Sequence, residues 1–456
     1  MQNLIFIKIF ILSLLFLIVV FREKKIRFYH PAILVAFVYV MEYGIPALYM
    51  TISPGEFMEY SRFLYSDILS NGLSFVVLTL LFFLLGFYSP YYNKHLKKLV
   101  VYCLKKIPNS NNYVIEIRNL PMIIILLLIF GWIARIFLIK TGAYFHAETG
   151  MDIELPQGFA LYSQYLSIIS LFPIVAICLL FSEWIKKVKD YKYLLFTVML
   201  IILEVLYALP SGSKERVIFP LFLLIAIYSL KKKIPVLTIL ITSAFALLFV
   251  FPFNEIYRNI TRTGDVISDC QYAFNIYLRT FTRFDSYSLD HLFFGIFGER
   301  LNFAVVVGSI VENTPRIWDF KMGYTYFLFF ISLVPRIIWP SKPGIASFAN
   351  DFGRDYGFIS PSDYTTSIAM SWIGEMFINF GWLGILVAFC YGLLYQTIYS
   401  YFLRSERIST LSIYLYSFSL YYMVRGDMFA EQFSGLLKIF TVVIFLFYPF
   451  LKKLKA

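Results

Sequence analysis

Apolar runs long enough to cross a lipid bilayer recur along the whole chain, and they constrain the fold more than any other feature. A membrane-spanning helix needs about 20 mostly apolar residues. Because 59% of the 456 residues are hydrophobic and only 15% are charged, a soluble globular protein is excluded. We predict an all-α polytopic membrane protein that forms a single membrane domain over residues 1–456. Its roughly eleven spans are expected at 3–21, 28–50, 73–89, 121–140, 159–182, 193–209, 217–230, 234–252, 381–403, 409–424 and 434–451.

Lysine and arginine are sorted between alternate connections. If residues 22–27 are cytoplasmic, that side of the membrane holds 22 basic residues, of which five are Arg. This bias follows the positive-inside rule and predicts a cytoplasmic C-terminus. The outer connections instead carry eleven Arg against four Lys, and planar guanidinium groups suit phosphate or carboxylate recognition. The alternative for any single outer Arg is an ion pair with a loop carboxylate such as Asp285, Asp319 or Asp355.

Several function classes find no support in the residues. The net charge of +12 lies in short loops beside apolar runs, which is a membrane pattern and not a nucleic-acid surface. The four cysteines and four histidines are scattered, without disulfide or zinc spacing. Metallopeptidase, serine-hydrolase and nucleotide-binding motifs do not occur. We therefore expect no metal, no cofactor and no nucleic-acid partner.

Residues 253–380 form a long stretch of intermediate hydrophobicity between the eighth predicted span and the last three. It contains two short apolar patches, at 302–311 and 323–339. Since the charge pattern places both ends of the stretch outside, the patches must cross an even number of times or re-enter without crossing. The many Tyr and Phe residues here are first of all interface anchors, with carbohydrate stacking as the alternative.

Proline and glycine punctuate the segment Val334–Gly344, which contains Arg336 and Lys342. Irregular backbone at membrane depth is tolerated where it is buried in protein or lines a water-filled cavity. Two cations fixed in such a place suit an anionic ligand. The alternative is a loop whose cations bind lipid headgroups without specificity.

A second segment, Ser211–Arg216, joins two predicted spans by a short polar turn. Its serines and glycine offer backbone N–H groups before a helix that is expected to begin near Lys214, and helix N-termini bind anions. Lys214 and Arg216 add positive charge. An ordinary tight turn with an N-cap serine is the alternative.

In a third segment, Glu375 and Asn379 lie one helical turn apart in apolar surroundings. A desolvated carboxyl group there either pairs with an arginine or becomes easier to protonate, and both outcomes suit a catalytic or positioning group. The alternative is a purely structural partner for Arg336 or another buried arginine.

The remaining outer arginines suggest further anion contacts. Arg258 and Arg262, and likewise Arg279 and Arg283, are spaced i, i+4, so on helices each pair would share one face. Like charges on one face repel unless an anion lies between them. Arg425 and Asp427, in the last outer turn, either join the same site or form a structural ion pair.

These three segments, Pro335–Pro343, Ser211–Arg216 and Gly374–Gly384, resemble those of the O-antigen or oligosaccharide repeat-unit polymerases of the Wzy type. The resemblance covers about a tenth of the chain. It implies a GT-C-like membrane glycosyltransferase that joins undecaprenyl-diphosphate-linked repeats at the outer face of the bacterial inner membrane. It also implies membrane lipid, a chain-length regulator and a flippase as partners.

Within that implied reaction, negative charge develops on the leaving diphosphate, where placed cations stabilise it. We expect catalytic roles for Glu375, Arg336 and Arg216, with Glu375 as the general base. Lys214 and Lys342 would hold the donor diphosphate together with the two catalytic arginines. Arg258, Arg262 and Arg283 would hold the second lipid carrier or saccharide, and Arg425 and Asn379 complete the predicted set.

Two other functions stay open at this point. An O-antigen ligase would share the fold and much of the chemistry but would transfer finished chain to a lipid A core. A lipid-linked oligosaccharide flippase or another transporter would distribute polar residues through both halves of its spans and show inverted repeats. Here the polar residues concentrate on the outer side, which favours the enzyme.

Overall fold

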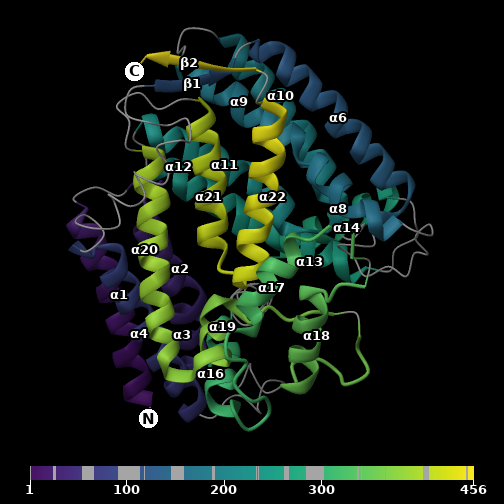
Figure 1. Ribbon diagram of the computed structural model, residues 1–456. Coiled ribbons are helices and arrows are strands. Elements are labelled where there is room, and N and C mark those ends of the chain that lie inside the picture. Colours follow the sequence, from purple (N-terminus) through teal and green to yellow (C-terminus); the bar gives the residue numbers. More distant parts are fainter. Residues whose placement is uncertain are drawn as a thin grey trace. The chain divides into compact units, whose positions relative to one another are not determined.

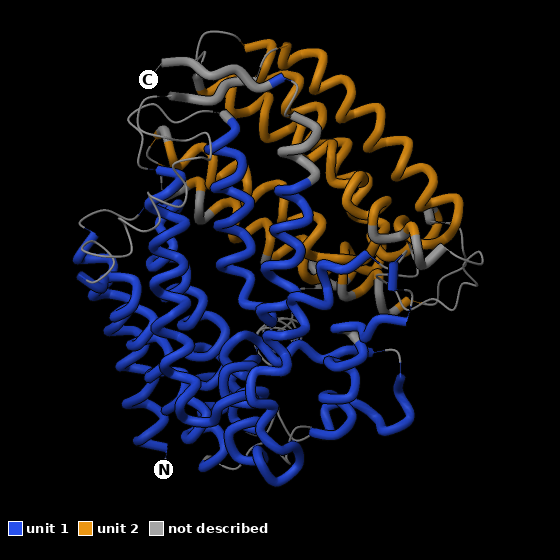
Figure 2. Tube along the Cα trace, in the orientation of Figure 1, with its two compact units in different colours: residues 1–116, 297–456 blue, residues 117–296 orange. Residues whose placement is uncertain are grey.

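Helices dominate the computed structural model of the chain (Figure 1). The structure describes residues 2–455, except 24–26, 54–65, 91–112, 118, 145–158, 187–190, 233, 235, 261–265, 284–301, 336–337, 340, 365, 404–409 and 448–449. The chain divides into two compact units, residues 1–116 with 297–456 and residues 117–296 (Figure 2).

Unit 1 combines the N-terminal helices with the C-terminal third of the chain. Its long helices are α1 (Gln2–Arg22), α4 (Ser66–Phe87), α20 (Gly384–Leu403), α21 (Thr410–Arg425) and α22 (Phe429–Phe447). Another span joins α2 (Pro31–Tyr39), the π-helical turn η1 (Val40–Gly44) and α3 (Ile45–Ile52). Shorter helices are α16 (Phe303–Asn313), α17 (Tyr324–Leu333), α18 (Ile345–Asp355) and α19 (Ser371–Phe380), the last continuing into η7 (Gly381–Leu383). Strand β1 (Tyr113–Ile117) pairs with β2 (Leu451–Lys455).

Unit 2 consists of helices. They are α6 (Leu120–Lys140), α8 (Phe159–Ile169), α9 (Phe172–Lys186), α10 (Tyr191–Ala208) with η4 (Leu209–Ser211), α11 (Lys214–Lys231), α12 (Val236–Phe245) with the π-helical η5 (Ala246–Val250), α13 (Phe251–Asn259) and α14 (Val266–Arg283). The predicted run 159–182 is two helices here, because a turn at residues 170–171 separates α8 from α9.

Seven helices in the described ranges are long and apolar enough to cross a membrane. They are Gln2–Arg22, Pro31–Ile52, Asp67–Phe87, Leu120–Lys140, Tyr165–Ile185, Tyr191–Ser211 and Ser371–Leu403. A helical fold with several helices able to span a membrane is therefore confirmed, whereas the eleven spans and the GT-C-like arrangement stay predictions. Helices α11, α21 and α22 cover three further predicted runs.

Glycine allows α4 to pack directly against two other helices of unit 1. A Cβ atom at Gly86 would lie 2.1 Å from the carbonyl oxygen of Phe389, and one at Gly392 would lie 2.1 Å from that of Phe83. These contacts join α4 to α20. Nearer the N-terminal end of α4, a Cβ atom at Gly72 would lie 2.6 Å from the Cα atom of Gly308 on α16. Small residues bring membrane helices together in this way because no side chain separates the backbones.

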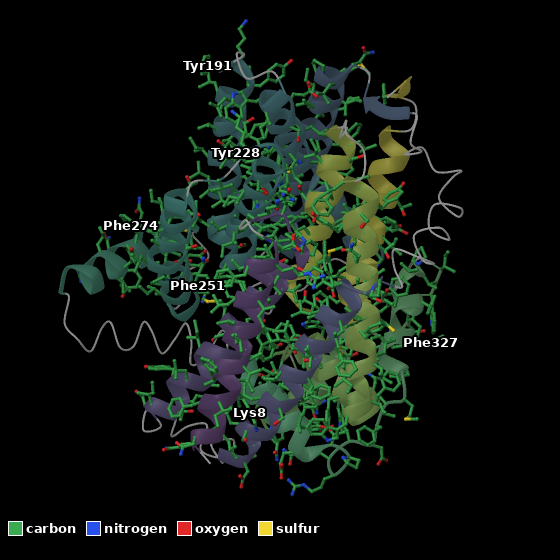
Figure 3. The ribbon with its side chains drawn as sticks, turned by 90° about the vertical axis from the view of Figure 1, so that its left-hand side faces the viewer. Lys8, Tyr191, Tyr228, Phe251, Phe274 and Phe327 are labelled. Carbon is green, nitrogen blue, oxygen red and sulfur yellow. The ribbon has the colours of Figure 1, made fainter. Side chains whose placement is uncertain are left out.

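Two helices of unit 1 are too short to cross a membrane alone. Helices α16 and α17 have 11 and 10 residues, so each is about 15 Å long, half of a hydrocarbon core of about 30 Å. They coincide with the apolar patches at 302–311 and 323–339. Helix α19 has 10 residues and continues through η7 into α20, as the first part of the span Ser371–Leu403. Phe327, labelled in Figure 3, is 57% exposed on α17, whereas residues 371–379 of α19 are all buried.

Proline explains the π-helical turn η1. Pro46 follows it at the start of α3, and a proline has no N–H to donate to the carbonyl four residues earlier. That carbonyl belongs to Glu42, and the Ile45 N–H reaches back five residues to Val40 instead. Such π turns occur often at functional sites. Glu42 therefore lies on an irregular turn inside a span.

Candidate functional site

Glu375 is the centre of a fully buried hydrogen-bond network in unit 1. Its Oε1 accepts a hydrogen bond from Thr325 Oγ1 at 2.6 Å, and its Oε2 accepts one from the Phe429 backbone N–H at 2.7 Å. Phe429 is the first residue of α22, so the carboxylate lies at a helix N-terminus, where negative charge is stabilised. The side chain is 0% exposed. Among the described residues, a hydroxyl and a backbone amide, and not an arginine, donate to this carboxylate.

Asn379 completes this network from the same helix, as its spacing predicted. Its amide nitrogen donates to Thr325 Oγ1 and to the Glu375 carbonyl, both at 2.7 Å. Its Oδ1 accepts from the Gly323 N–H at 2.9 Å. Gly323 directly precedes α17 and has a positive φ of 91°. Together, Glu375 and Asn379 fix the starts of α17 and α22, which also pack against each other (Figure 1).

Helix α19 also holds the turn between α21 and α22. The Trp372 N–H donates to the Gly426 carbonyl at 2.9 Å, while Glu375 binds the other end of the turn at Phe429. Within the turn, Arg425 Nε forms an ion pair with Asp427 Oδ2. The structure therefore favours the ion-pair alternative for Arg425. Both side chains are partly exposed, Arg425 to 31% and Asp427 to 16%.

Lys342 is buried in the proline- and glycine-containing segment Val334–Gly344 after α17, with an exposure of 8%. Its ammonium group donates to the carbonyl oxygens of Ser332 at 3.1 Å and Val334 at 2.6 Å. Both carbonyls lie at the C-terminal end of α17, where a positive charge is favoured. The backbone here is irregular, as predicted, and Arg336 lies outside the described residues.

The polar turn of unit 2 has the predicted start of a helix, because α11 begins at Lys214. Ser213 occupies the N-cap position without a side-chain cap. The Lys214 ammonium lies 4.7 Å from the ring centre of Phe251, a residue labelled in Figure 3. Arg216 lies 4.7 Å from the ring centre of Tyr144. Burial raises the pKa of the Tyr144 phenol, and the Arg216 guanidinium acts in the opposite direction.

The paired arginines are only partly as predicted. Arg258 lies on α13, which ends at Asn259, and Arg262 lies outside the described residues, so this pair stays a prediction. Arg279 and Arg283 do share α14. Lys214, Arg216, Arg258 and Arg283 belong to unit 2, whereas Glu375, Asn379, Lys342 and Arg425 belong to unit 1. Their predicted convergence on one ligand thus stays a prediction.

Sequence reasoning missed a buried salt bridge in unit 2. Arg135 of α6 donates to both carboxylate oxygens of Glu204 on α10, at 2.8 and 2.7 Å. Its Nε donates to the Ser170 carbonyl at 2.9 Å, and its guanidinium lies 4.1 Å from the ring centre of Tyr207. The signal was present, because each charge interrupts an apolar run.

Glu42 was missed in the same way. It is the one carboxylate in the apolar run 28–50. Its Oε2 lies 3.9 Å from the position that a Cβ atom on Gly426 would take. The Arg425–Asp427 turn therefore has a second carboxyl group beside it. Such a cluster has the groups needed to move a proton or to hold a polar ligand.

The described residues contain no group of three or more side chains suited to bind a metal ion. No curated protein and no solved structure matches the chain. One family does match, over residues 152–429, more than half of the chain, and its description is a domain of unknown function, DUF8712. The matched range includes Lys214, Lys342, Glu375 and Asp427. The chain belongs to the DUF8712 family.

Proposed function

We propose that this protein is a membrane glycosyltransferase that polymerises polysaccharide repeat units. It transfers a growing undecaprenyl-diphosphate-linked glycan onto an incoming lipid-linked repeat at the outer face of the bacterial inner membrane. The product is O-antigen, capsule or another exopolysaccharide. In this proposal the architecture is GT-C-like with about eleven spans and a cytoplasmic C-terminus, and the enzyme needs no cofactor.

The observation that carries the proposal is the polar interior of unit 1, built by the half-length helix α17 and the first part of the span Ser371–Leu403. Helices α17 and α19 bring Thr325, Glu375 and Asn379 together, and the Arg425–Asp427 turn is held next to them. Short helices and ionisable groups inside a membrane protein are tolerated where they serve a polar substrate. The resemblance of three segments to repeat-unit polymerases narrows that substrate to a lipid-linked saccharide.

Cations have a defined part in this reaction. Breaking the sugar–diphosphate bond leaves negative charge on the diphosphate, and Lys or Arg side chains stabilise it without nucleotide hydrolysis. Lys342, Arg336, Lys214 and Arg216 are assigned to this role, with Arg258, Arg262 and Arg283 for the second lipid carrier. Replacing Arg216 or Arg336 by Ala should abolish long polymer at normal expression. Full-length polymer from either variant would contradict the assignment of that arginine to the diphosphate site.

Reconstitution tests the function itself. Purified full-length protein in proteoliposomes receives the lipid-linked repeat unit without a membrane gradient, and the products are separated by length. Extended chains support a polymerase. Movement of the repeat unit across the bilayer without extension would instead indicate a flippase, and transfer only to added lipid A core would indicate a ligase.

A deletion strain gives an independent readout. Loss of a polymerase leaves single repeats attached to the acceptor, whereas loss of a ligase leaves none. We expect single repeats, with long chains restored by the wild-type gene.

A further inference from the structure

Glu42 lies near the centre of a membrane span and beside the turn that contains Arg425 and Asp427. It is close to the midpoint of the 22-residue span Pro31–Ile52. Its Oε2 lies 3.9 Å from the position that a Cβ atom on Gly426 would take, so the carboxylate is in van der Waals contact with the turn. Ionisable residues at this depth are rare in membrane proteins and face polar pathways or the bundle interior.

The charges of this cluster are suited to proton uptake. It contains the carboxyl groups of Glu42 and Asp427 and one guanidinium group, that of Arg425. Two carboxylates and one guanidinium carry one excess negative charge, so one added proton makes the cluster neutral in a poorly solvated place. Among the described residues, Glu42 itself accepts no hydrogen bond and forms no ion pair. Its side chain is half-buried.

Tyr43 gives a second, independent indication of a ligand. Its side chain is 0% exposed, and its hydroxyl is close to Glu42 and Ser371 without making a well-formed hydrogen bond to any described residue. A buried hydroxyl without a hydrogen-bond partner destabilises the folded protein. A polar group that enters the cluster, such as a sugar hydroxyl, would supply that partner.

Ser371 adds a strained backbone at the same place. Its φ of 59° is positive, which is unusual for a residue other than glycine, and it is followed by Trp372, which holds the Gly426 carbonyl. Strain of this kind is retained where the surrounding structure fixes it, often at functional sites.

Glu375 has a contact pattern that suits a positioning role better than the proton-accepting role that its sequence context suggested. Both of its carboxylate oxygens accept hydrogen bonds from protein groups, and the side chain is 0% exposed. Glu375 binds the N–H of Phe429, which is the first residue of α22 and lies two residues after Asp427. Its position is that of a residue that holds the turn in place.

We propose that Glu42 is the general base of the transfer reaction, with the Arg425–Asp427 ion pair beside it and Glu375 as a positioning residue. This rests on the proposed glycosyl transfer. The proton of the acceptor hydroxyl moves to the Glu42 carboxylate, and the hydroxyl oxygen forms the new bond to the anomeric carbon of the donor. The bond from that carbon to the diphosphate breaks, and its electron pair leaves on the diphosphate oxygen. The proton then passes from Glu42 to the diphosphate.

The test compares Glu42→Gln with Glu375→Gln in the reconstituted full-length protein, using the lipid-linked repeat unit as probe. Loss of a general base lowers a rate by about 10²- to 10⁴-fold. We expect this loss for Glu42→Gln at unchanged thermal stability, together with loss of the decline in rate on the acidic side. Glu375→Gln should keep that acidic decline, because the groups facing the reacting hydroxyl, Glu42, Asp427, Arg425 and Tyr43, remain.

Three outcomes separate this inference from the proposed function. Folded wild-type protein that extends no acceptor contradicts the function. Wild-type polymerisation with a Glu42→Gln rate within threefold of it overturns the assignment of Glu42 alone. If Glu42→Gln does not fold, Glu42→Asp takes its place: a carboxylate shorter by one methylene should keep the acidic decline and lose at least tenfold in rate, and an unchanged rate overturns the assignment.

Discussion

Two buried carboxylates inside the membrane-spanning helices are stabilised in different ways. In unit 2, Glu204 is neutralised by Arg135 through two hydrogen bonds, with side-chain exposures of 5% and 1%. In unit 1, Glu375 receives its hydrogen bonds from a hydroxyl and from the N-terminus of a helix. Within the described residues, no cation pairs with it. The first arrangement balances charge, whereas the second uses local dipoles.

The two carboxylates therefore have different structural roles. The Arg135–Glu204 pair joins α6 to α10, with each carboxylate oxygen bound to the same guanidinium group. The Glu375 network joins the starts of two helices next to a turn that has its own charged groups. Removing parts of each should therefore affect unit 2 mainly through stability and unit 1 also through activity.

The largest effect is expected from Arg135→Leu. It leaves the Glu204 carboxylate buried without its counter-ion, which destabilises a protein by about 3–5 kcal/mol. Unfolding of the purified protein in mixed micelles measures this loss. The double variant Arg135→Leu/Glu204→Leu is the control, and it should recover most of the stability because no charge remains. A single variant as stable as the wild type would contradict the balanced pair.

Thr325→Val should have the next largest effect. The valine keeps the shape of the side chain but removes the donor to Glu375 and the acceptor for Asn379. Leaving buried polar groups unpaired costs about 1–3 kcal/mol. The same unfolding measurement applies, with Thr325→Ser as the matched control that retains the hydroxyl. Equal stability of the valine and serine variants would show that the network is not needed.

A smaller loss is expected from Tyr395→Phe on α20. The Tyr395 hydroxyl donates to the Met423 carbonyl at 3.0 Å and accepts from Gln432 Nε2 at 2.9 Å. Removing one partner of a neutral hydrogen bond costs about 1 kcal/mol. The free energy of unfolding measures the loss, and a gain in stability would indicate that these bonds are not formed.

The smallest effect is expected one helical turn earlier, for Tyr391→Phe. Tyr391 is 4% exposed, and its hydroxyl has no hydrogen-bond partner among the described residues. Removing an unpaired buried hydroxyl should change the free energy of unfolding by less than about 0.5 kcal/mol or increase it. Since both tyrosines lie on one helix, the two variants form a matched pair. A loss larger than that of Tyr395→Phe would point to a bound water or ligand at Tyr391.

Much of the fold was predictable, because apolar runs alone locate membrane helices. The runs 3–21 and 121–140 correspond to α1 and α6 within one residue at each end. The half-length helices were ambiguous, since a run of about ten apolar residues fits a buried helix, a re-entrant segment or part of a span.

The candidate site was predictable only in part. The spacing of Glu375 and Asn379 placed them on one helix, as found. Their partner Thr325 lies 50 or more residues away in the chain, and local spacing has no information on such contacts. Glu42 and Arg135 could have been noticed as single charges in apolar runs. What each of them pairs with depends on the packing of distant helices.

The glycine contacts of α4 have a consequence for motion. Where backbones touch without intervening side chains, as at Gly86 and Gly392, a helix cannot rotate about its axis or slide without a collision. Helix α4 therefore keeps α16 and α20 at fixed positions along its length. We expect any opening of unit 1 to involve the α21–α22 hairpin, since α19 holds the turn of that hairpin by hydrogen bonds.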